Sequence, residues 1–262
     1  MKVGAITMIL PRMELFHLPH WIDHLRKNEF DKVWIFCEPE LSHDNCYSDN
    51  PSITWKKKPE ADYNLHLTSS EAIECVREIA AEAMIEVEVL ISGADAAAVG
   101  IRQSQVCYRL LNRLKSNEER AWDWMTFLDV DEYLVVPEGR LEDVLHSIPS
   151  QFSRVQMQQK VFYSRWNNGA PIDISSIGDN YGVCNFNHKY FFRPSKLKKF
   201  GNVHNSPDAY GKKFAIDPTR LRFHHFRGSP DSIGGARRLG ALPRYVKLKD
   251  RPVQPLDFSH QY

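Results

Sequence analysis

The feature that most constrains the fold of this chain is residues 122–137, where a short apolar run ends abruptly in carboxylates. Residues 124–128 (WMTFL) have the length and composition of a buried strand, and Asp129, Asp131 and Glu132 follow directly. Burying unpaired carboxylates is costly, so a strand does not end in this way for packing reasons. In extended backbone alternate side chains share a face, which predicts that Asp129 and Asp131 project to the same side.

Two carboxylates at the end of a strand predict a site for a hard divalent cation, because such ions take oxygen ligands. In open α/β sheets the carboxyl ends of the strands are also where ligands bind. The alternative, an acidic strand exit facing water, stays open, because Asp-x-Asp by itself is weak evidence. An EF-hand is excluded, since its glycine and closing glutamate are missing downstream. A phosphatase of the haloacid-dehalogenase type would need threonine where Tyr133 stands.

The order of the predicted elements is that of an α/β sheet. Residues 2–10 and 31–37 are apolar runs of strand length, and residues 15–25 between them have apolar side chains at helical spacing. Strand, helix, strand in this order opens a parallel sheet. Residues 68–71 (TSSE) form a capping-box signature that starts another helix.

The middle of the chain continues the pattern. Residues 85–91 alternate between apolar and acidic side chains, as a half-buried strand does, and residues 101–115 have helical periodicity. We predict that strands 85–91 and 124–130 are neighbours in the interior of the sheet, with helix 101–115 packed on one face between them. Further on, residues 141–148 predict a short amphipathic helix and residues 154–163 an extended strand.

Bulk properties exclude several classes of protein. The 262 residues carry a formal net charge of +1 with both signs mixed, which gives no basis for nucleic-acid binding. The five cysteines include no C-x-x-C pair, which argues against a disulfide framework or a zinc site and favours a reducing compartment. No apolar run reaches the length of a membrane span. We therefore expect a cytoplasmic protein without a transmembrane segment, while peripheral membrane association and the oligomeric state stay open.

Residues 124–133 (WMTFLDVDEY) resemble the W-x-x-F-x-D-x-D-E-F core of GT-A glycosyltransferases, especially the family-2-like and family-92-like enzymes. The resemblance implies a GT-A-like (Rossmann-like) α/β fold, with a mixed, mostly parallel sheet sandwiched by helices. It implies one domain over residues 1–262, in which 1–137 bind the nucleotide sugar, 138–240 form the acceptor side and 241–262 are a tail. The implied activity is that of a hexosyltransferase-type enzyme, which transfers a sugar from a nucleotide-sugar donor to a hydroxyl of a glycan, lipid-linked or protein-glycan acceptor.

The same resemblance implies a metal site. Asp129 and Asp131 would hold Mn2+ or Mg2+ on the diphosphate of the donor. Residues 188–194 (HKYFFRP) and 201–204 (GNVH) resemble the family's K-x-I-x-R-P and G-x-H motifs, which implies that His204 completes the metal shell. An imidazole is an acceptable ligand for manganese. Residues 221–229 resemble the closing H-Y-x-x-x-S strand, so the alternative metal ligands are His224 and His225.

Several further residues are implied to bind the donor or to act in catalysis. Lys189 and Arg193 would neutralise the departing diphosphate, and Asp179 would be the general base, ahead of Asp173 and Asp208. His24 matches a histidine near the start of the family's pattern, although a helix histidine that packs on its neighbours is the preferred interpretation. The expected donor-binding residues on helix 101–115 and after the second strand are Gln105, Arg109, Asn112, Glu38 and Asp44.

Two other classes stay open at this point. A nucleotidyltransferase also places two carboxylates at a strand end, and it would cleave a nucleoside triphosphate with release of pyrophosphate. A catalytically silent protein of the same fold would bind a carbohydrate or nucleotide without forming product. A nucleotide sugar as substrate distinguishes the glycosyltransferase from both.

Overall fold

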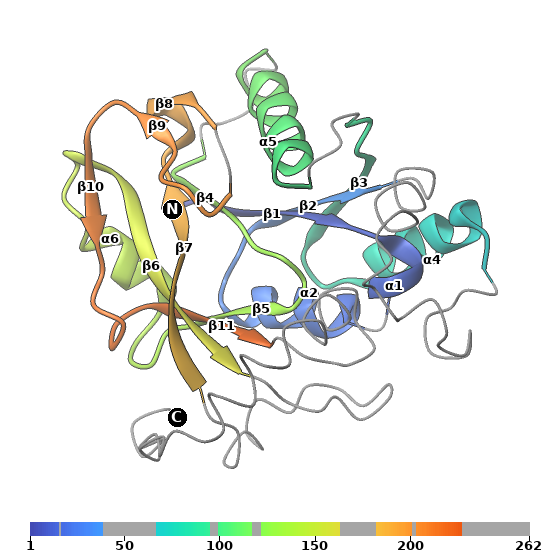
Figure 1. Ribbon diagram of the computed structural model, residues 1–262, viewed down its shortest axis with the longest axis horizontal. Helices are drawn as coiled ribbons and strands as arrows, with labels where there is room; N and C mark the ends of the chain where they lie inside the picture. Colours follow the sequence, from blue (N-terminus) through green and yellow to red (C-terminus); the bar gives the residue numbers. More distant parts are fainter. Residues whose placement is uncertain are drawn as a thin grey trace, which may run out of the picture.

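The sheet is built outward from β1 (Val3–Ile9), whose seven residues are all buried. The computed structural model describes residues 1–15, 17–38, 67–94, 99–116, 122–162, 182–200 and 203–226. Strands β2 (Lys32–Cys37) and β4 (Trp124–Phe127) flank β1 and run parallel to it. Since a strand without charged side chains can be buried on both faces, the composition of β1 explains its central place. Figure 1 shows these strands at the centre of the molecule.

The strand order within the sheet differs from the prediction. Strand β3 (Glu86–Ile91) pairs with β2, so β1 and β2 separate it from β4, and the predicted neighbourhood of these two segments is wrong. The physical reason is the polarity of β3. Its Glu86 is exposed and Glu88 half-buried, a pattern suited to the end of the sheet, where β3 lies, rather than to its interior.

The second half of the chain extends the sheet from β4. The order of the main path is β3-β2-β1-β4-β7-β6-β11-β5, and β10 pairs with β6. Pairing is antiparallel for β4–β7, β6–β7 and β11–β5 and parallel for the remaining pairs of this sheet, so the predicted mixed, mostly parallel α/β fold is confirmed. These later strands are β5 (Glu132–Val135), β6 (Phe152–Phe162), β7 (Gly182–Phe192), β10 (Lys212–Ala215) and β11 (Arg222–Phe226). Strands β8 (Leu197–Lys199) and β9 (Asp208–Ala209) form a separate pair.

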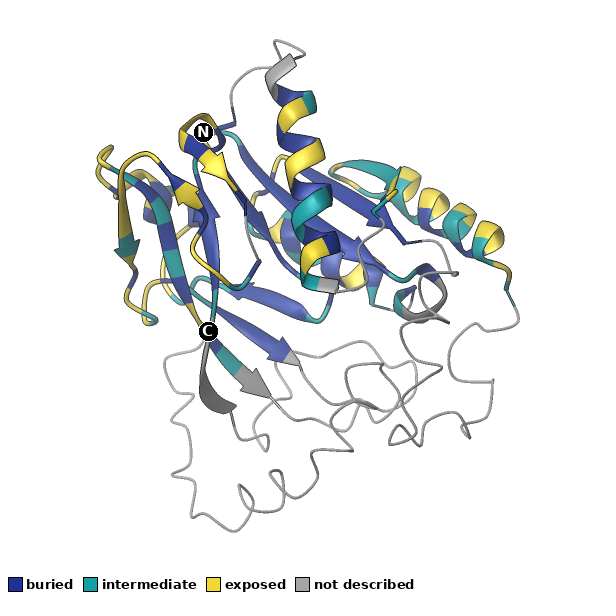
Figure 2. Ribbon diagram, turned by 45° about the horizontal axis from the view of Figure 1, so that its top comes forward, coloured by how far each residue is buried: buried dark blue, intermediate teal, exposed yellow. Residues whose placement is uncertain are grey.

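Helices cover both faces of the sheet. One apolar cluster joins side chains of α2 (Leu18–Lys27), α4 (Ser69–Glu82) and α6 (Leu141–His146) to one face, and a second cluster joins α5 (Val99–Ser116) to the other. The central strands are buried between them, whereas α4 and α5 expose their outer faces (Figure 2). The short helix α1 (Pro11–Glu14) follows β1 directly. Among the described residues, no helix is long and apolar enough to cross a membrane.

Local signals in the sequence are confirmed where they depend on neighbouring residues. The capping box at the start of α4 is present, with the Thr68 side chain accepting from the Glu71 backbone and the Glu71 side chain accepting from Thr68. It satisfies two of the backbone N–H groups that a helix start leaves without partners. The helices predicted over 101–115 and 141–148 and the strand predicted over 154–163 are also present.

Candidate functional site

The carboxylates after β4 lie on a turn rather than on extended backbone. The Glu132 backbone N–H donates to the Asp129 carbonyl at 2.9 Å, and β5 begins at Glu132. The alternation argument that placed Asp129 and Asp131 on one face is therefore wrong. A turn directs the two side chains to different neighbours, Asp129 toward α5 and β7 and Asp131 toward β11.

Asp129 accepts hydrogen bonds on both of its carboxylate oxygens. Gln103 of α5 donates to Oδ1 at 3.0 Å, and Lys189 of β7 donates to Oδ2 at 3.1 Å. The Asp129 side chain is still 25 % exposed. Each carboxylate oxygen has a second lone pair, so Asp129 can accept a further bond from a ligand.

Lys189 neutralises two carboxylates at once. Its side chain is completely buried, with Nζ 2.8 Å from Glu132 Oε2 and 3.1 Å from Asp129 Oδ2. Burial lowers the pKa of Lys189, but the Asp129 and Glu132 carboxylates outweigh that effect and leave the pKa above its ordinary value. Lys189 therefore stays charged and stabilises the turn by its contacts with Asp129 and Glu132. The role that the sequence resemblance implied for Lys189 was to neutralise the departing diphosphate.

Asp131 meets a histidine of β11. His225 Nε2 lies 3.1 Å from Asp131 Oδ2, in a pair of which the histidine is nearly buried and the aspartate 30 % exposed. The antiparallel register pairs His225 with Glu132, which brings this end of β11 beside the turn. The adjacent His224 accepts from Arg222 Nε at 3.1 Å, and burial holds its pKa well below the ordinary range.

The structure thus gives the contact with Asp131 to His225, whereas the sequence placed His204 there first. His204 lies between β8 and β9, next to Val203, which packs in the apolar cluster on the α5 face. The register of β11 against β5 decides which of the two adjacent histidines faces the site. The sequence does not contain this register, and a His-His pair alone does not reveal which ring faces the site.

The connection after β1 adds two side chains that the sequence patterns did not single out. Burial raises the pKa of Glu14 to about 8, against the opposing hydrogen bond from the Leu10 backbone, and the charges of Asp131, Asp129 and Glu38 raise it further. Burial lowers the pKa of His17, and the Asp131 charge opposes this. Glu14 and His17 are therefore electrostatically coupled to the turn.

The donor-side candidates are only partly brought together. Glu38, directly after β2, forms a buried ion pair with Arg102 of α5, whose Nη2 donates to Oε2 at 3.1 Å. Arg109 donates to the Ser92 carbonyl at 2.7 Å instead. Gln105 is half-buried and Asn112 is exposed on α5. Arg102 and Gln103 of α5 contact the carboxylates of Glu38 and Asp129, and sequence reasoning missed both residues.

Arg193 lies beside the start of β4, whereas the carboxylate turn, where the diphosphate was expected, follows the end of β4. Its guanidinium is 4.0 Å from the centre of the Trp124 ring, and its Nε donates to the Phe152 carbonyl at 3.2 Å. Because β7 runs antiparallel to β4, Lys189 lies near the end of β4 and Arg193 near its start. Asp208 is exposed in β9, whereas Asp44, Asp173, Asp179 and the tail 241–262 lie outside the described residues.

His24 packs against its neighbours, as the preferred interpretation of the sequence predicted. Its Nε2 lies 2.7 Å from the Leu134 carbonyl, and its ring meets Tyr133 edge to face at 5.0 Å. Burial, ahead of the opposing hydrogen bond to Leu134, lowers the pKa of His24 to about 4. The neutral ring of His24 therefore connects α2 to β5, the strand that follows the carboxylate turn, through its contacts with Tyr133 and Leu134.

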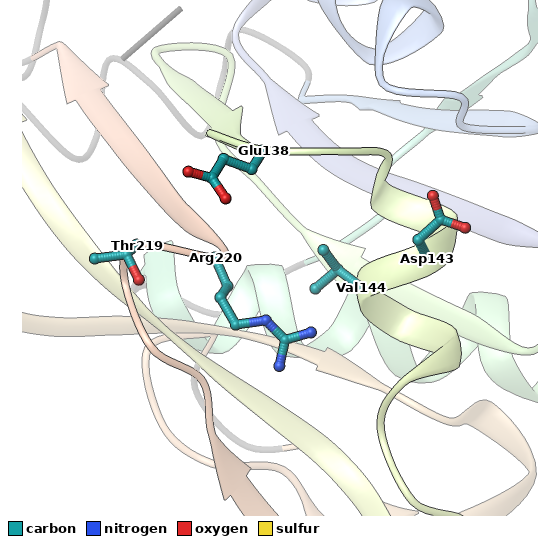
Figure 3. Close-up of a pocket in the computed structure, with 5 residues that line it drawn as sticks. All are labelled: Glu138, Asp143, Val144, Thr219 and Arg220. Atoms are coloured by element: carbon teal, nitrogen blue, oxygen red, sulfur yellow. The ribbon is translucent and has the colours of Figure 1, made fainter. Parts of the chain in front are cut away.

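The structure also contains a cavity of about 250 Å³ (Figure 3). Its lining residues are Glu138, Asp143, Val144, Thr219 and Arg220. Glu138 follows the end of β5 and Arg220 precedes β11, whereas Glu132 and His225 lie at the opposite ends of these two strands. The cavity is thus separate from the candidate site.

Together, the fold and the site define an α/β protein with a cluster of carboxylates, one lysine and one histidine beyond the end of a central parallel strand. No protein-family model matches the chain. The chain is similar to a galactan β-1,4-galactosyltransferase, GALS3, from Arabidopsis thaliana, with 29% identity over 120 residues that cover 40% of this chain and 23% of that protein. The chain thus matches less than a quarter of the length of this relative.

Solved structures with a similar arrangement of the backbone have lower sequence identity to this chain than the galactosyltransferase has. TarS of S. aureus (residues 1–349) has 13% identity and a TM-score of 0.40 over 100% of this chain and 68% of that one. HddC from Yersinia pseudotuberculosis has 12% identity and a TM-score of 0.39 over 92% and 99% of the two chains. A UDP-glucose pyrophosphorylase complexed with UDP-glucose has 8% identity and a TM-score of 0.36 over 94% and 100%. Similarity at this level carries no argument about function.

Proposed function

We propose that this protein is a metal-dependent glycosyltransferase, which transfers a sugar from a nucleotide-sugar donor to a hydroxyl of a carbohydrate-type acceptor. The observation that carries the proposal is the pair Asp131 and His225, 3.1 Å apart beside the acidic turn that follows β4. The sequence similarity to a galactosyltransferase supports the same reaction class.

The donor atoms of this pair fit a divalent cation. Two ligands bound at about 2.1 Å to neighbouring positions of an octahedral ion lie about 3 Å apart, which matches the separation of Asp131 Oδ2 and His225 Nε2. Oxygen together with imidazole suits manganese. Within the described ranges, no group of three or more histidine, cysteine, aspartate or glutamate side chains is arranged around one metal position. Two protein ligands leave positions for the oxygens of a diphosphate.

We assign distinct roles to the residues around this pair. Asp131 and His225 would hold Mn2+ or Mg2+, which would stabilise the charge that develops on the diphosphate leaving group. Asp129 would bind the donor through its remaining lone pairs, with Gln103 and Lys189 fixing its orientation. The general base stays assigned to Asp179, outside the described residues.

The experiment is a donor screen on the purified chain. We expect release of a nucleoside diphosphate from one class of nucleotide sugar with Mn2+, and loss of that release with a chelator. Release of pyrophosphate from a nucleoside triphosphate and a sugar phosphate would favour a nucleotidyltransferase instead. Stabilisation of the fold by a nucleotide sugar, without turnover of any donor and acceptor, would favour a catalytically silent binding protein.

A further inference from the structure

Glu132 is the least accessible carboxylate of the site among the described residues. Its side chain is completely buried, and its two oxygens serve different neighbours. Oε2 accepts from Lys189 Nζ at 2.8 Å and from the Asp129 backbone N–H at 2.9 Å. Burial raises the pKa of Glu132, and the charge of Lys189 opposes this. As the ionised partner of the buried ammonium group, Glu132 can only accept hydrogen bonds.

The other oxygen of Glu132 points at the histidine of the proposed metal site. Glu132 Oε1 lies 3.4 Å from His225 Nδ1 and has no hydrogen-bond donor among the described residues. A buried acceptor without a donor costs free energy, of the order of 1–3 kcal/mol. A proton on His225 Nδ1 would supply the donor after a small rotation of the ring.

The second neighbour of Nδ1 does not decide where the proton lies. The Gln159 amide nitrogen contacts His225 Nδ1, and Gln159 Oε1 is a further buried oxygen without a donor in the described part of the chain. A half-turn of the amide exchanges its nitrogen and oxygen, so Gln159 accommodates either tautomer. Glu132, 3.4 Å from Nδ1, and Asp131, 3.1 Å from Nε2, can each accept the single ring proton of neutral His225. A cation bound by Asp131 and Nε2 leaves Nδ1 as the position of this proton, with Glu132 as its carboxylate acceptor.

We propose that Glu132 is the positioning residue of His225: its Oε1 accepts the Nδ1 proton, so that Nε2 faces Asp131 without a proton, as a ligand for the cation. This inference rests on the proposed metal-dependent function. A metal-bound histidine whose other ring nitrogen donates to a carboxylate is held in both orientation and tautomer. Lys189, Glu132 and His225 then form one chain, which connects β7, β5 and β11 to the metal position.

The first test compares Mn2+ binding to the wild-type chain and to Glu132→Gln by titration calorimetry. Loss of the carboxylate is expected to weaken Mn2+ binding by roughly 10- to 100-fold. The matched control is Glu82→Gln, an exposed glutamate at the end of α4, which should bind Mn2+ as wild type does. Equal affinity of Glu132→Gln and wild type would overturn this inference alone, whereas no Mn2+ binding by wild type would overturn the metal proposal with it.

The second test needs no variant of Glu132 and holds even where that variant fails to fold. In the Co2+-loaded wild-type chain, proton NMR should show a hyperfine-shifted, solvent-exchangeable N–H signal of the metal-bound imidazole, which is absent in His225→Gln. In folded Glu132→Gln this N–H should exchange faster with water. A bound His225 ring without such a proton in wild type would show that Nδ1 carries none and would overturn the assignment.

Discussion

The ammonium nitrogen of Lys189 lies 2.8 Å from Glu132 Oε2, and both side chains are completely buried. The two residues come from strands that do not pair directly, since β7 and β5 are separated in the sheet by β6 and β11. The ion pair therefore connects Glu132, at the start of β5, to β7, which pairs with β4 on the other side of the turn. Buried charges at this position need a partner, because desolvating them alone is costly.

Removing the Lys189 charge should destabilise the fold. Lys189→Met leaves Glu132 and Asp129 without their cation, which for a buried pair costs about 3–5 kcal/mol. Urea denaturation would measure the loss in the free energy of unfolding. The exposed Lys199→Met serves as a control and should change it little. The double variant Lys189→Met, Glu132→Gln should be more stable than Lys189→Met, and a lower stability would contradict the charge argument.

Asp131 should be required for metal-dependent binding but not for folding. Asp131→Asn keeps the volume of a partly exposed side chain and removes the charge beside His225. We expect Mn2+-dependent binding of a nucleoside diphosphate to disappear and turnover to fall by roughly 100-fold or more. Calorimetry with and without Mn2+ measures the binding, and Glu82→Gln, at an exposed position at the end of α4, is the control. Unchanged, metal-dependent affinity in Asp131→Asn would refute the site.

His24 should make the fold sensitive to acid. Its pKa is lowered from 6.5 to about 4 in the fold, so between these values the unfolded chain binds a proton that the native chain does not. The contribution of a neutral His24 to the free energy of unfolding is therefore present above pH 6.5 and is lost as the pH falls toward 4, by about 3 kcal/mol. His24→Gln should show a smaller decrease in unfolding free energy over this range. An identical decrease in both proteins would contradict this.

Glu14 should make the fold less stable as the pH rises, the opposite of the effect of His24. Its pKa is raised from 4.5 to about 8, chiefly by burial, so the native chain keeps a proton that the unfolded chain has lost. Its contribution to stability is present at low pH and is lost as the pH rises through 8. Glu14→Gln, which cannot ionise, should therefore gain stability relative to wild type between pH 5 and pH 8.5, as measured by denaturation at each pH. A constant difference would show that Glu14 titrates normally.

The sequence by itself determined the local elements of this protein. The uncharged composition of β1, the capping box at Thr68 and the helical period of α5 act through residues a few positions apart, and each predicted its element. The abrupt change from WMTFL to Asp129, Asp131 and Glu132 also indicated where the candidate site lies, since desolvation of carboxylates is a property of the residues themselves.

Only the tertiary structure decided how these elements meet. The polar strand β3 lies at the end of the sheet, two strands away from β4, and a turn rather than extended backbone separates Asp129 from Asp131. His225, 94 positions after Asp131, reaches it through the register of β11 against β5, whereas His204 follows another strand. Lys189 reaches the turn and Arg193 does not, because β7 runs antiparallel to β4. Such contacts depend on strand order and register, which long-range pairing sets and local periodicity does not.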